Sequence, residues 1–492
     1  MKHRRTAVLV VIALGILVSI AAARPGGGES FSGGGGHGGG GGHSGGGSGG
    51  GGFAFELIYW GFQLIFHYPA IGLPILALII AAIAWSAHKQ RENSDWDSGP
   101  ASEPTRIADT GSLRDLDPDF SQVVFEDFAF RLFSTAHRAR SSSEALASVA
   151  PYVSQPARQS LAERVPIGVP VVQVIVGSLR TVRVEVPETA QARVRIAIEF
   201  EANVATAEHT YYSVETWLFG RDAGQHSKPP RAARTFPCPN CGAPWQSTAT
   251  GTQQCANCNQ VVDNGRFDWI VETIALSSQS QRAPSLTSEV EERGTDLPTY
   301  KAPDRDHEWD ALVAQDPAVS ESTFEARLAM IFDRLNKAWS ANALTPVRGL
   351  VSDGLYDYLN YWIDAYKRQG LRNQLSDMRI TAVEYAKVTR DRWYDAITIR
   401  IWGTGKDFVV KSATGELLRG SKHSERRYSE YWTLIRSAAR RGAPKADAAC
   451  GNCGAPLAIT MAGACEHCGA YLASGDFDWV VSKIEQDDTY RG

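Results

Sequence analysis

Eight cysteines form the most specific chemical pattern in this 492-residue chain. They lie in two clusters, each built from two Cys-x-x-Cys pairs, and the octet CPNCGAPW at 238–245 returns as CGNCGAPL at 450–457. Four thiolates held in two such pairs suit tetrahedral coordination of zinc. We therefore predict two structural zinc ions. Their ligands are Cys238, Cys241, Cys255 and Cys258 in the first cluster, and Cys450, Cys453, Cys465 and Cys468 in the second.

Two other chemistries fit the same cysteines. Iron in a rubredoxin-like site is one, because tetrahedral thiolate suits both metals. Disulfides are the other, and they would be favoured if the clusters faced an oxidising compartment. A metal site closed by four cysteines leaves no coordination position for a substrate, so its expected role is structural. The sequence thus predicts zinc ribbons at 236–262 and 448–472. Their stretches CANCNQVVDNG and CEHCGAYLASG contain no Lys or Arg, so nucleic acid is not an expected partner.

The sequence around the clusters repeats as well. Asp-Pro stands at 117–118 and again at 316–317, and YYSVETWLFGR is followed in the second half by RYSEYWTLIR. The last cysteine precedes a Phe-Asp-Trp tryptophan by the same distance in both halves, from Cys258 to Trp269 and from Cys468 to Trp479. The pattern predicts an α+β domain duplicated in tandem, with helices first, then a mainly antiparallel sheet, and a cysteine cluster between the last two strands.

Local patterns place the elements that must position these residues. Phe324, Leu328 and Ile331 recur at spacings of four and three, as on one face of a helix. The Asp-Pro pairs are expected to open this helix and its counterpart. On the later strands, a glutamate and an arginine recur on one face, and they are expected to form a retained ion pair or to stand as edge charges. These residues are Glu215 and Arg221 in the first half, and Glu430 and Arg436 in the second.

The N-terminal residues predict that the chain is exported through a membrane and then crosses back to the cytoplasmic side. Residues 1–23 have the basic head, apolar stretch and small residues of a signal peptide, with an uncleaved anchor helix as the alternative. Residues 24–52 form a Gly-rich linker, and residues 53–88 form a membrane segment with one span at about 70–87. Positive charges directly after the span place the rest of the chain in the cytoplasm.

The remaining boundaries follow from composition. Residues 89–113 and 277–310 are polar linkers, and they separate a first domain at 114–276 from a second at 311–488. The hydrophobic fraction of 43% and the charged fraction of 21% are ordinary for a globular protein. The formal net charge of −4 gives no overall basic signal for nucleic acid.

Several stretches of the second half resemble a known family. DPAVSESTFEARLAMIFDRLNKAW, GKDFVVKSATGELLRGS and RYSEYWTLIR are similar to the C-terminal (Tim44-like) domain of the 44-kDa subunit of the mitochondrial inner-membrane translocase, and to its bacterial membrane-anchored relatives. The first half matches through Asp117-Pro118, Phe125, Glu215, Trp217 and Arg221. The resemblance implies two tandem cone-shaped domains like nuclear transport factor two, with helices over a curved antiparallel sheet. The inserted cysteine clusters depart from the family pattern.

The resemblance implies a scaffold and no reaction. We therefore expect a non-enzymatic, membrane-anchored tether in the inner (plasma) membrane, whose soluble domains face the cytoplasm and bind an unidentified protein, in protein translocation or membrane-protein biogenesis. One alternative is binding of lipid or another small apolar ligand in the domain cavities. A further alternative is a small-molecule hydrolase or isomerase, with His209, Asp395 and Glu384 as candidate acid–base residues. None of these three stands in a recognisable motif.

Overall fold

The structure is a computed structural model. It describes residues 108–187, 192–229, 236–246, 253–281, 295, 297–442, 450, 455, 465, 467–468, 478–487, 490 and 492. The predicted signal peptide, Gly-rich linker and membrane segment lie outside the described residues. Within the described part of the chain, no helix is both long enough and apolar enough to cross a bilayer.

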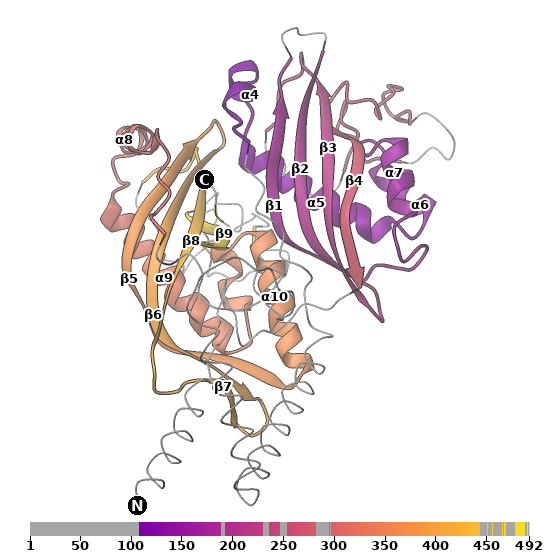
Figure 1. Ribbon diagram of the computed structural model, residues 1–492. Coiled ribbons are helices and arrows are strands. Elements are labelled where there is room, and N and C mark those ends of the chain that lie inside the picture. Colours follow the sequence, from indigo (N-terminus) through magenta and orange to yellow (C-terminus); the bar gives the residue numbers. More distant parts are fainter. Residues whose placement is uncertain are drawn as a thin grey trace, which may run out of the picture.

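The first half, residues 108–281, consists of helices followed by one antiparallel sheet (Figure 1). Its helical elements are α4 (Gly111–Leu116), α5 (Gln122–Ala139), α6 (Ser143–Leu146), η1 (Ala147–Val149) and α7 (Gln155–Ala162). Its strands are β1 (Gln173–Glu185), β2 (Arg193–Ala205), β3 (Thr210–Asp222) and β4 (Ile270–Gln281), which pair in the order β1-β2-β3-β4. The first cysteine cluster therefore stands between the last two strands.

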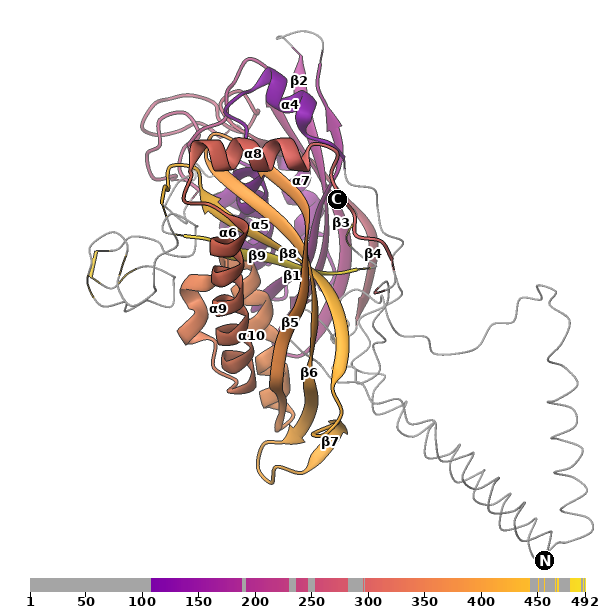
Figure 2. The ribbon, with the colours of Figure 1, turned by 90° about the vertical axis from the view of Figure 1, so that its left-hand side faces the viewer.

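The second half, residues 295–492, repeats this order. Its helical elements are α8 (Arg305–Gln315), α9 (Glu321–Ser340), η2 (Thr345–Leu350) and α10 (Asp353–Arg368). Its strands are β5 (Leu371–Arg390), β6 (Tyr394–Lys411), β7 (Leu417–Gly420), β8 (Arg426–Ser437) and β9 (Val480–Gln486). They pair in the order β5-β6-β8-β9, with the short β7 added on β6, and α9 and α10 lie on one face of this sheet (Figure 2). The prediction of an α+β fold with antiparallel sheets is confirmed.

The two halves share helix caps and strand contacts at matching positions, which similar composition alone does not explain. Ser121 and Ser320 are the N-caps of α5 and α9. A parallel bridge joins the start of α7 to β4, Val153 to Val271, and the same bridge joins the start of α10 to β9, Val351 to Val481. These matched contacts tie a helix to the strand that follows the cysteine cluster in each half.

Two sequence expectations differ from the structure. The Asp-Pro pairs do not open the long helices, because Asp117 and Asp316 are the C-cap residues of α4 and α8. Each long helix begins five residues after its aspartate, directly after a serine cap. The stretch 277–310 is not all linker, since β4 continues to Gln281 and α8 begins at Arg305. In β4, Leu276 is 38% exposed and the polar residues 277 and 278 are exposed, as expected for the edge strand of a sheet. Because these residues are polar, the sequence pattern indicated a linker and not a strand.

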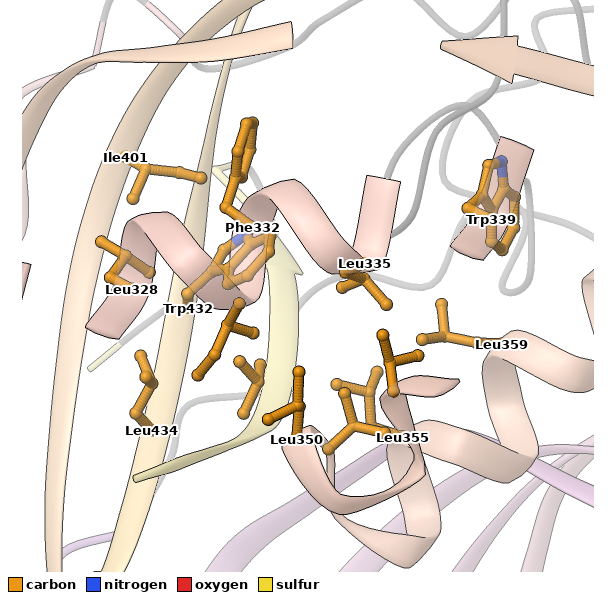
Figure 3. Close-up of a cluster of buried hydrophobic side chains, with 14 of the residues drawn as sticks. Leu328, Phe332, Leu335, Trp339, Leu350, Leu355, Leu359, Ile401, Trp432 and Leu434 are labelled. Carbon is orange, nitrogen blue, oxygen red and sulfur yellow. The ribbon is translucent and has the colours of Figure 1, made fainter. Parts of the chain in front are cut away.

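Each half has an apolar core, and Ile175 of β1 in the first half joins the core of the second half. In the second half, one face of α9 presents Leu328, Phe332 and Leu335 toward the sheet (Figure 3). Trp432 and Leu434 of β8 and Ile401 of β6 meet them, and residues of η2 and α10 close the cluster. Burial of these large side chains fixes how the helices sit on the sheet.

The halves also contact each other. The indole of Trp393 donates to the carbonyl oxygen of Asp119 at 3.0 Å, and the ammonium of Lys483 pairs with Glu126 at 2.7 Å. A small apolar cluster around Val480 includes Val123 and Val124 of α5. The strand β1 lies on the side of the first sheet nearer the second half, and β4 lies on the far side (Figure 1).

Candidate metal centres and buried ion pairs

The first cysteine cluster brings four sulfurs together. The Sγ atoms of Cys238, Cys241, Cys255 and Cys258 all lie within 4.8 Å of one another. The distance is 3.8 Å both from Cys238 to Cys258 and from Cys241 to Cys255. A tetrahedron with zinc–sulfur bonds of about 2.3 Å has edges of about 3.8 Å, whereas a disulfide bond is about 2.05 Å long. The geometry therefore fits a four-coordinate metal ion and excludes cystines in this cluster.

The backbone folds into two matching turns around these sulfurs. The amide of Gly242 donates to the carbonyl of Cys238 at 2.9 Å, and the amide of Asn259 donates to the carbonyl of Cys255 at 2.8 Å. Gly242 and Asn259 both have positive φ angles, 75° and 56°. Glycine adopts this conformation freely and asparagine tolerates it, which explains the residue type directly after each Cys-x-x-Cys pair.

Each turn also donates to a sulfur of the other turn. The side-chain amide of Asn240 lies 3.4 Å from Sγ of Cys258, and that of Asn257 lies 3.5 Å from Sγ of Cys241. The hydrogen bond from Asn257 lowers the pKa of the exposed Cys241 thiol to about 6, whereas burial raises the pKa of Cys238 to about 12. A bound cation would favour all four thiolates, so this donor set suits a metal that binds thiolate.

The second cluster repeats the arrangement where it is described. Sγ atoms of Cys450, Cys465 and Cys468 lie within 4.8 Å of one another, with 3.7 Å from Cys450 to Cys468. The amide of Cys450 donates to the carbonyl of Ala455 at 2.8 Å, as the amide of Cys238 does to Ala243 at 2.9 Å. Cys453, the fourth predicted ligand, lies outside the described residues. The donor set is therefore compatible with a second metal ion of the same kind.

The first cluster is attached to the body of its half by polar contacts. The hydroxyl of Tyr152 donates to the carbonyl of Pro237 at 2.8 Å, and the indole of Trp245 donates to the carbonyl of Ala147 at 2.9 Å. Lys228 donates both to the carbonyl of Pro239 in the cluster and to the carbonyl of Phe267 at 2.9 Å. These contacts hold the cysteine cluster against η1 and the strand ends, as expected for a structural module.

A buried ion pair explains why three distant motifs recur together. Arg221 of β3 pairs with Asp117 at 2.8 Å, and its guanidinium lies over Trp269 at 4.5 Å. In the second half, Arg436 pairs with Asp316 at 3.0 Å and lies over Trp479 at 4.7 Å. Both arginines are 1% exposed. The Asp-Pro pair, the strand arginine and the Phe-Asp-Trp tryptophan thus build one structural unit in each half.

The recurring glutamates have a different role from the predicted one. Glu215 and Glu430 do not pair with the arginines of their strands, because each accepts a hydrogen bond at 3.0 Å from the indole two residues later, Trp217 and Trp432. Both glutamates are 1% exposed. The alternative of edge charges is equally wrong, since both side chains point into the core beside an aromatic ring.

Sequence reasoning missed His137. This histidine of α5 is fully buried, and its Nε2 lies 3.3 Å from Oε2 of Glu215. Burial opposes ionisation of Glu215, but the charge and hydrogen bond of His137, together with Arg164 and Trp217, outweigh it and lower the pKa of Glu215 to about 2. A signal was present, because His137 falls four residues after Phe133, on the apolar face of the helix.

The three candidate acid–base residues do not form a catalytic group. His209 is exposed in the turn between β2 and β3. Asp395 is buried and is flanked by Arg390 at 3.5 Å and Arg436 at 3.6 Å. Glu384 lies on β5 within 3.5 Å of Lys301, and its side chain is 43% exposed. Each therefore serves a local contact, and the structure does not bring the three together.

The buried carboxylates predict acid sensitivity of the first half. Burial opposes ionisation of Asp117, but hydrogen bonds from Arg221 and Ser227 lower its pKa below the ordinary value, as those around Glu215 do. A carboxyl whose folded pKa is depressed stabilises the fold above its unfolded pKa of about 4, and this contribution is lost as the pH falls through the folded value. We expect the urea midpoint of the first half to fall between about pH 4 and pH 2. The Asp117→Asn variant should show a smaller fall over the same range, while acid release of a metal would affect both proteins alike. Equal falls would contradict the prediction.

Comparison with known protein families finds a match for part of the second half of the chain. Residues 308–445 match the model of the Tim44-like domain family. No curated protein matches the chain. The chain also aligns with the crystal structure of an acyl-CoA hydrolase from Agrobacterium tumefaciens, with a TM-score of 0.10 and 9% identity over 69% of this chain and 94% of that chain. A TM-score this low carries no argument about fold or activity.

Proposed function

From the premise that residues 308–445 are a Tim44-like domain, we propose that this protein is a membrane-anchored, non-enzymatic scaffold that binds proteins at the cytoplasmic face of the inner membrane. Tim44-like domains are associated with protein translocation, so a role in translocation or membrane-protein biogenesis is the natural context. The family match is the observation that carries the proposal.

The contacts of the second half support a structural role for its buried charges. Arg436 is held between Asp316 and Asp395, at 3.0 and 3.6 Å, and Arg390 lies 3.5 Å from Asp395. These groups neutralise one another inside the fold and join α8 to the sheet. We infer that these buried ion pairs hold α8 in one position on the sheet. A scaffold needs such a fixed surface to bind a partner protein.

The proposal includes a tandem duplication. The matched caps, parallel bridges and Asp–Arg–Trp units support two copies of one cone-shaped fold like nuclear transport factor two. We further propose that zinc binds each cysteine cluster and that the predicted span at about 70–87 holds both copies at the membrane. Two rigid modules on one anchor would offer two binding surfaces at a fixed separation.

Photo-crosslinking in intact membranes tests the scaffold. A photoreactive amino acid at Leu417 or Leu418, which are 42% and 41% exposed, samples the surface of the second half. We expect discrete adducts with one or a few membrane-associated proteins. The same probe in a chain that carries Arg436→Met, which weakens the second half, should lose them. If the second half crosslinks to no protein at these positions or at the exposed Tyr300, the scaffold role is wrong.

A further inference from the structure

The interior of the first half contains a buried cluster of charged side chains that the scaffold role does not use. His137 lies on α5, Arg140 is the C-cap residue of α5, Glu215 lies on β3, and Arg164 follows α7. His137, Arg140 and Glu215 are 0%, 3% and 1% exposed, and the side chain of Arg164 is 11% exposed. Arg164 Nε lies 3.7 Å from Glu215. We call these four residues the interior cluster.

The interior cluster has more positive than negative charge. The cluster has two guanidinium groups and one carboxylate, and only Arg164 lies within ion-pair distance of Glu215. Burial lowers the pKa of Arg140, with Glu215 opposing and the like charge of Arg164 adding to the effect. Burial of uncompensated charge is unfavourable by several kcal/mol. An additional anion at this place would balance the cluster.

Several polar atoms around the cluster have no hydrogen-bond partner among the described residues. They are Oγ of Ser134, Nδ1 of His137, Nε of Arg140, Nε and Nη2 of Arg164, and Oγ of Ser213. Ser134 lies one turn before His137 on α5, and Ser213 lies two residues before Glu215 on the same face of β3. Buried polar groups are almost always paired, so a group of unpaired donors on neighbouring elements indicates a missing acceptor.

The second half provides an internal comparison. It keeps the glutamate and its indole donor, with Trp432 donating to Glu430 at 3.0 Å. The positions that match His137 and Arg140, counted from Phe133 and Phe332, are Asn336 and Trp339. The second half therefore forms without cationic counterparts of His137 and Arg140.

The cluster lies beneath an apolar surface loop at residues 165–172. The carbonyl of Val165 accepts hydrogen bonds from Arg140 at 3.2 Å and from Gln279 of β4 at 2.8 Å, which fixes the loop over the cluster. The loop carries no charge, and Val165, Ile167 and Val172 are 54%, 68% and 60% exposed. Arg164, directly before the loop, is the member of the cluster nearest to solvent.

We propose that the interior cluster binds the carboxylate of a small apolar acid, with the carboxylate between Arg140, Arg164 and His137 and the apolar body toward the loop at 165–172. A carboxylate supplies the single negative charge, and its two oxygens match the paired N–H groups of a guanidinium. The apolar body would cover side chains that otherwise face water.

Isothermal titration of the full chain in a non-ionic detergent, with hexanoate and acetate as probes, tests the proposal. We expect saturable binding of one hexanoate per chain, and weaker binding of acetate, which lacks most of the apolar body. Arg164→Gln should weaken both by at least about tenfold, because one charged hydrogen bond contributes about 1.5 kcal/mol or more. Arg158→Gln is the matched control. It lies on α7, donates to backbone carbonyls away from the cluster, and should bind as the unchanged protein does.

A second variant keeps the test independent of folding. Ile167→Asp changes an exposed side chain, so it should leave the fold intact while it weakens hexanoate more than acetate. The proposal is overturned if neither acid binds saturably, if Arg164→Gln and Arg158→Gln bind equally, or if two acids bind per chain. The last outcome would place a site in the second half, which lacks counterparts of His137 and Arg140.

Discussion

Replacement of Cys241 by serine is expected to reduce the metal content of the reduced protein from two zinc ions per chain to one. Sγ of Cys241 lies 3.8 Å from that of Cys255 and belongs to the closed set of four sulfurs. Three thiolates and a hydroxyl bind zinc far more weakly, and structural zinc sites contribute apparent binding energies of about 10–16 kcal/mol. The cluster and the adjacent strand β4 should lose their protection from hydrogen exchange, while the second half keeps its own.

The matched variant Cys468→Ser should remove the other ion. Asn257→Ala is the control for the hydrogen bond alone, because it removes a donor to Cys241 without removing a ligand. It should weaken zinc binding but retain two ions at saturating metal. Metal analysis that finds none in the unchanged reduced protein would rule out the zinc interpretation, and iron in its place would confirm the site but not the metal.

Replacement of Arg221 by methionine should cost the first half about 3–5 kcal/mol, since it leaves a buried carboxylate without its partner. Asp117 would keep its hydrogen bonds from Ser227, at 2.8 and 2.7 Å, and from the amide of Asp119 at 3.2 Å, and its contact with the exposed His226 at 3.3 Å. Arg436→Met should cost the second half a similar amount, because it removes the partner of Asp316. Hydrogen exchange of β3 and of β8, followed separately, measures the two effects.

A double variant separates the charge from the packing. Asp117→Asn combined with Arg221→Met removes the unpaired charge and should recover part of the lost free energy of unfolding. A single Arg221→Met variant that loses less than about 1 kcal/mol would show that the pair contributes no more than a surface salt bridge does.

The recurrence in the sequence predicted the class of fold well. Helices before an antiparallel sheet, and a cysteine cluster between the last two strands, follow from periodicity and order alone. The same recurrence marked Asp117, Arg221 and Trp269 as special but did not show that they meet. They lie far apart in the chain. The pairing of β3 with β4 brings Arg221 beside Trp269, and the end of α4 brings Asp117 to Arg221. The repetition of the Asp-Pro, strand-arginine and Phe-Asp-Trp motifs in the same order therefore indicated that the three motifs contact one another.

Other features could not be predicted from the sequence, for physical reasons. The long helices start at serine caps after the Asp-Pro turns. Because Asp and Pro occur both near the start and near the end of helices, the Asp-Pro pairs did not show which end they mark. His137 has no counterpart in the second half, so comparison of the halves could not reveal it. The interior cluster joins residues from α5, from β3 and from the segment after α7, and a pattern along one element does not predict contacts among three.

The contacts between the halves give the two cysteine clusters different connections to the rest of the molecule. The strand that follows the first cluster, β4, lies at the sheet edge away from the second half (Figure 1). The strand that follows the second cluster, β9, carries Lys483, which pairs with Glu126 of α5 at 2.7 Å, and Val480, which packs near Val123. Damage to the first cluster should stay local, whereas damage to the second should spread across the boundary. Loss of the metal from the second cluster is thus expected to loosen the contact between the halves, whereas loss of the metal from the first cluster is not.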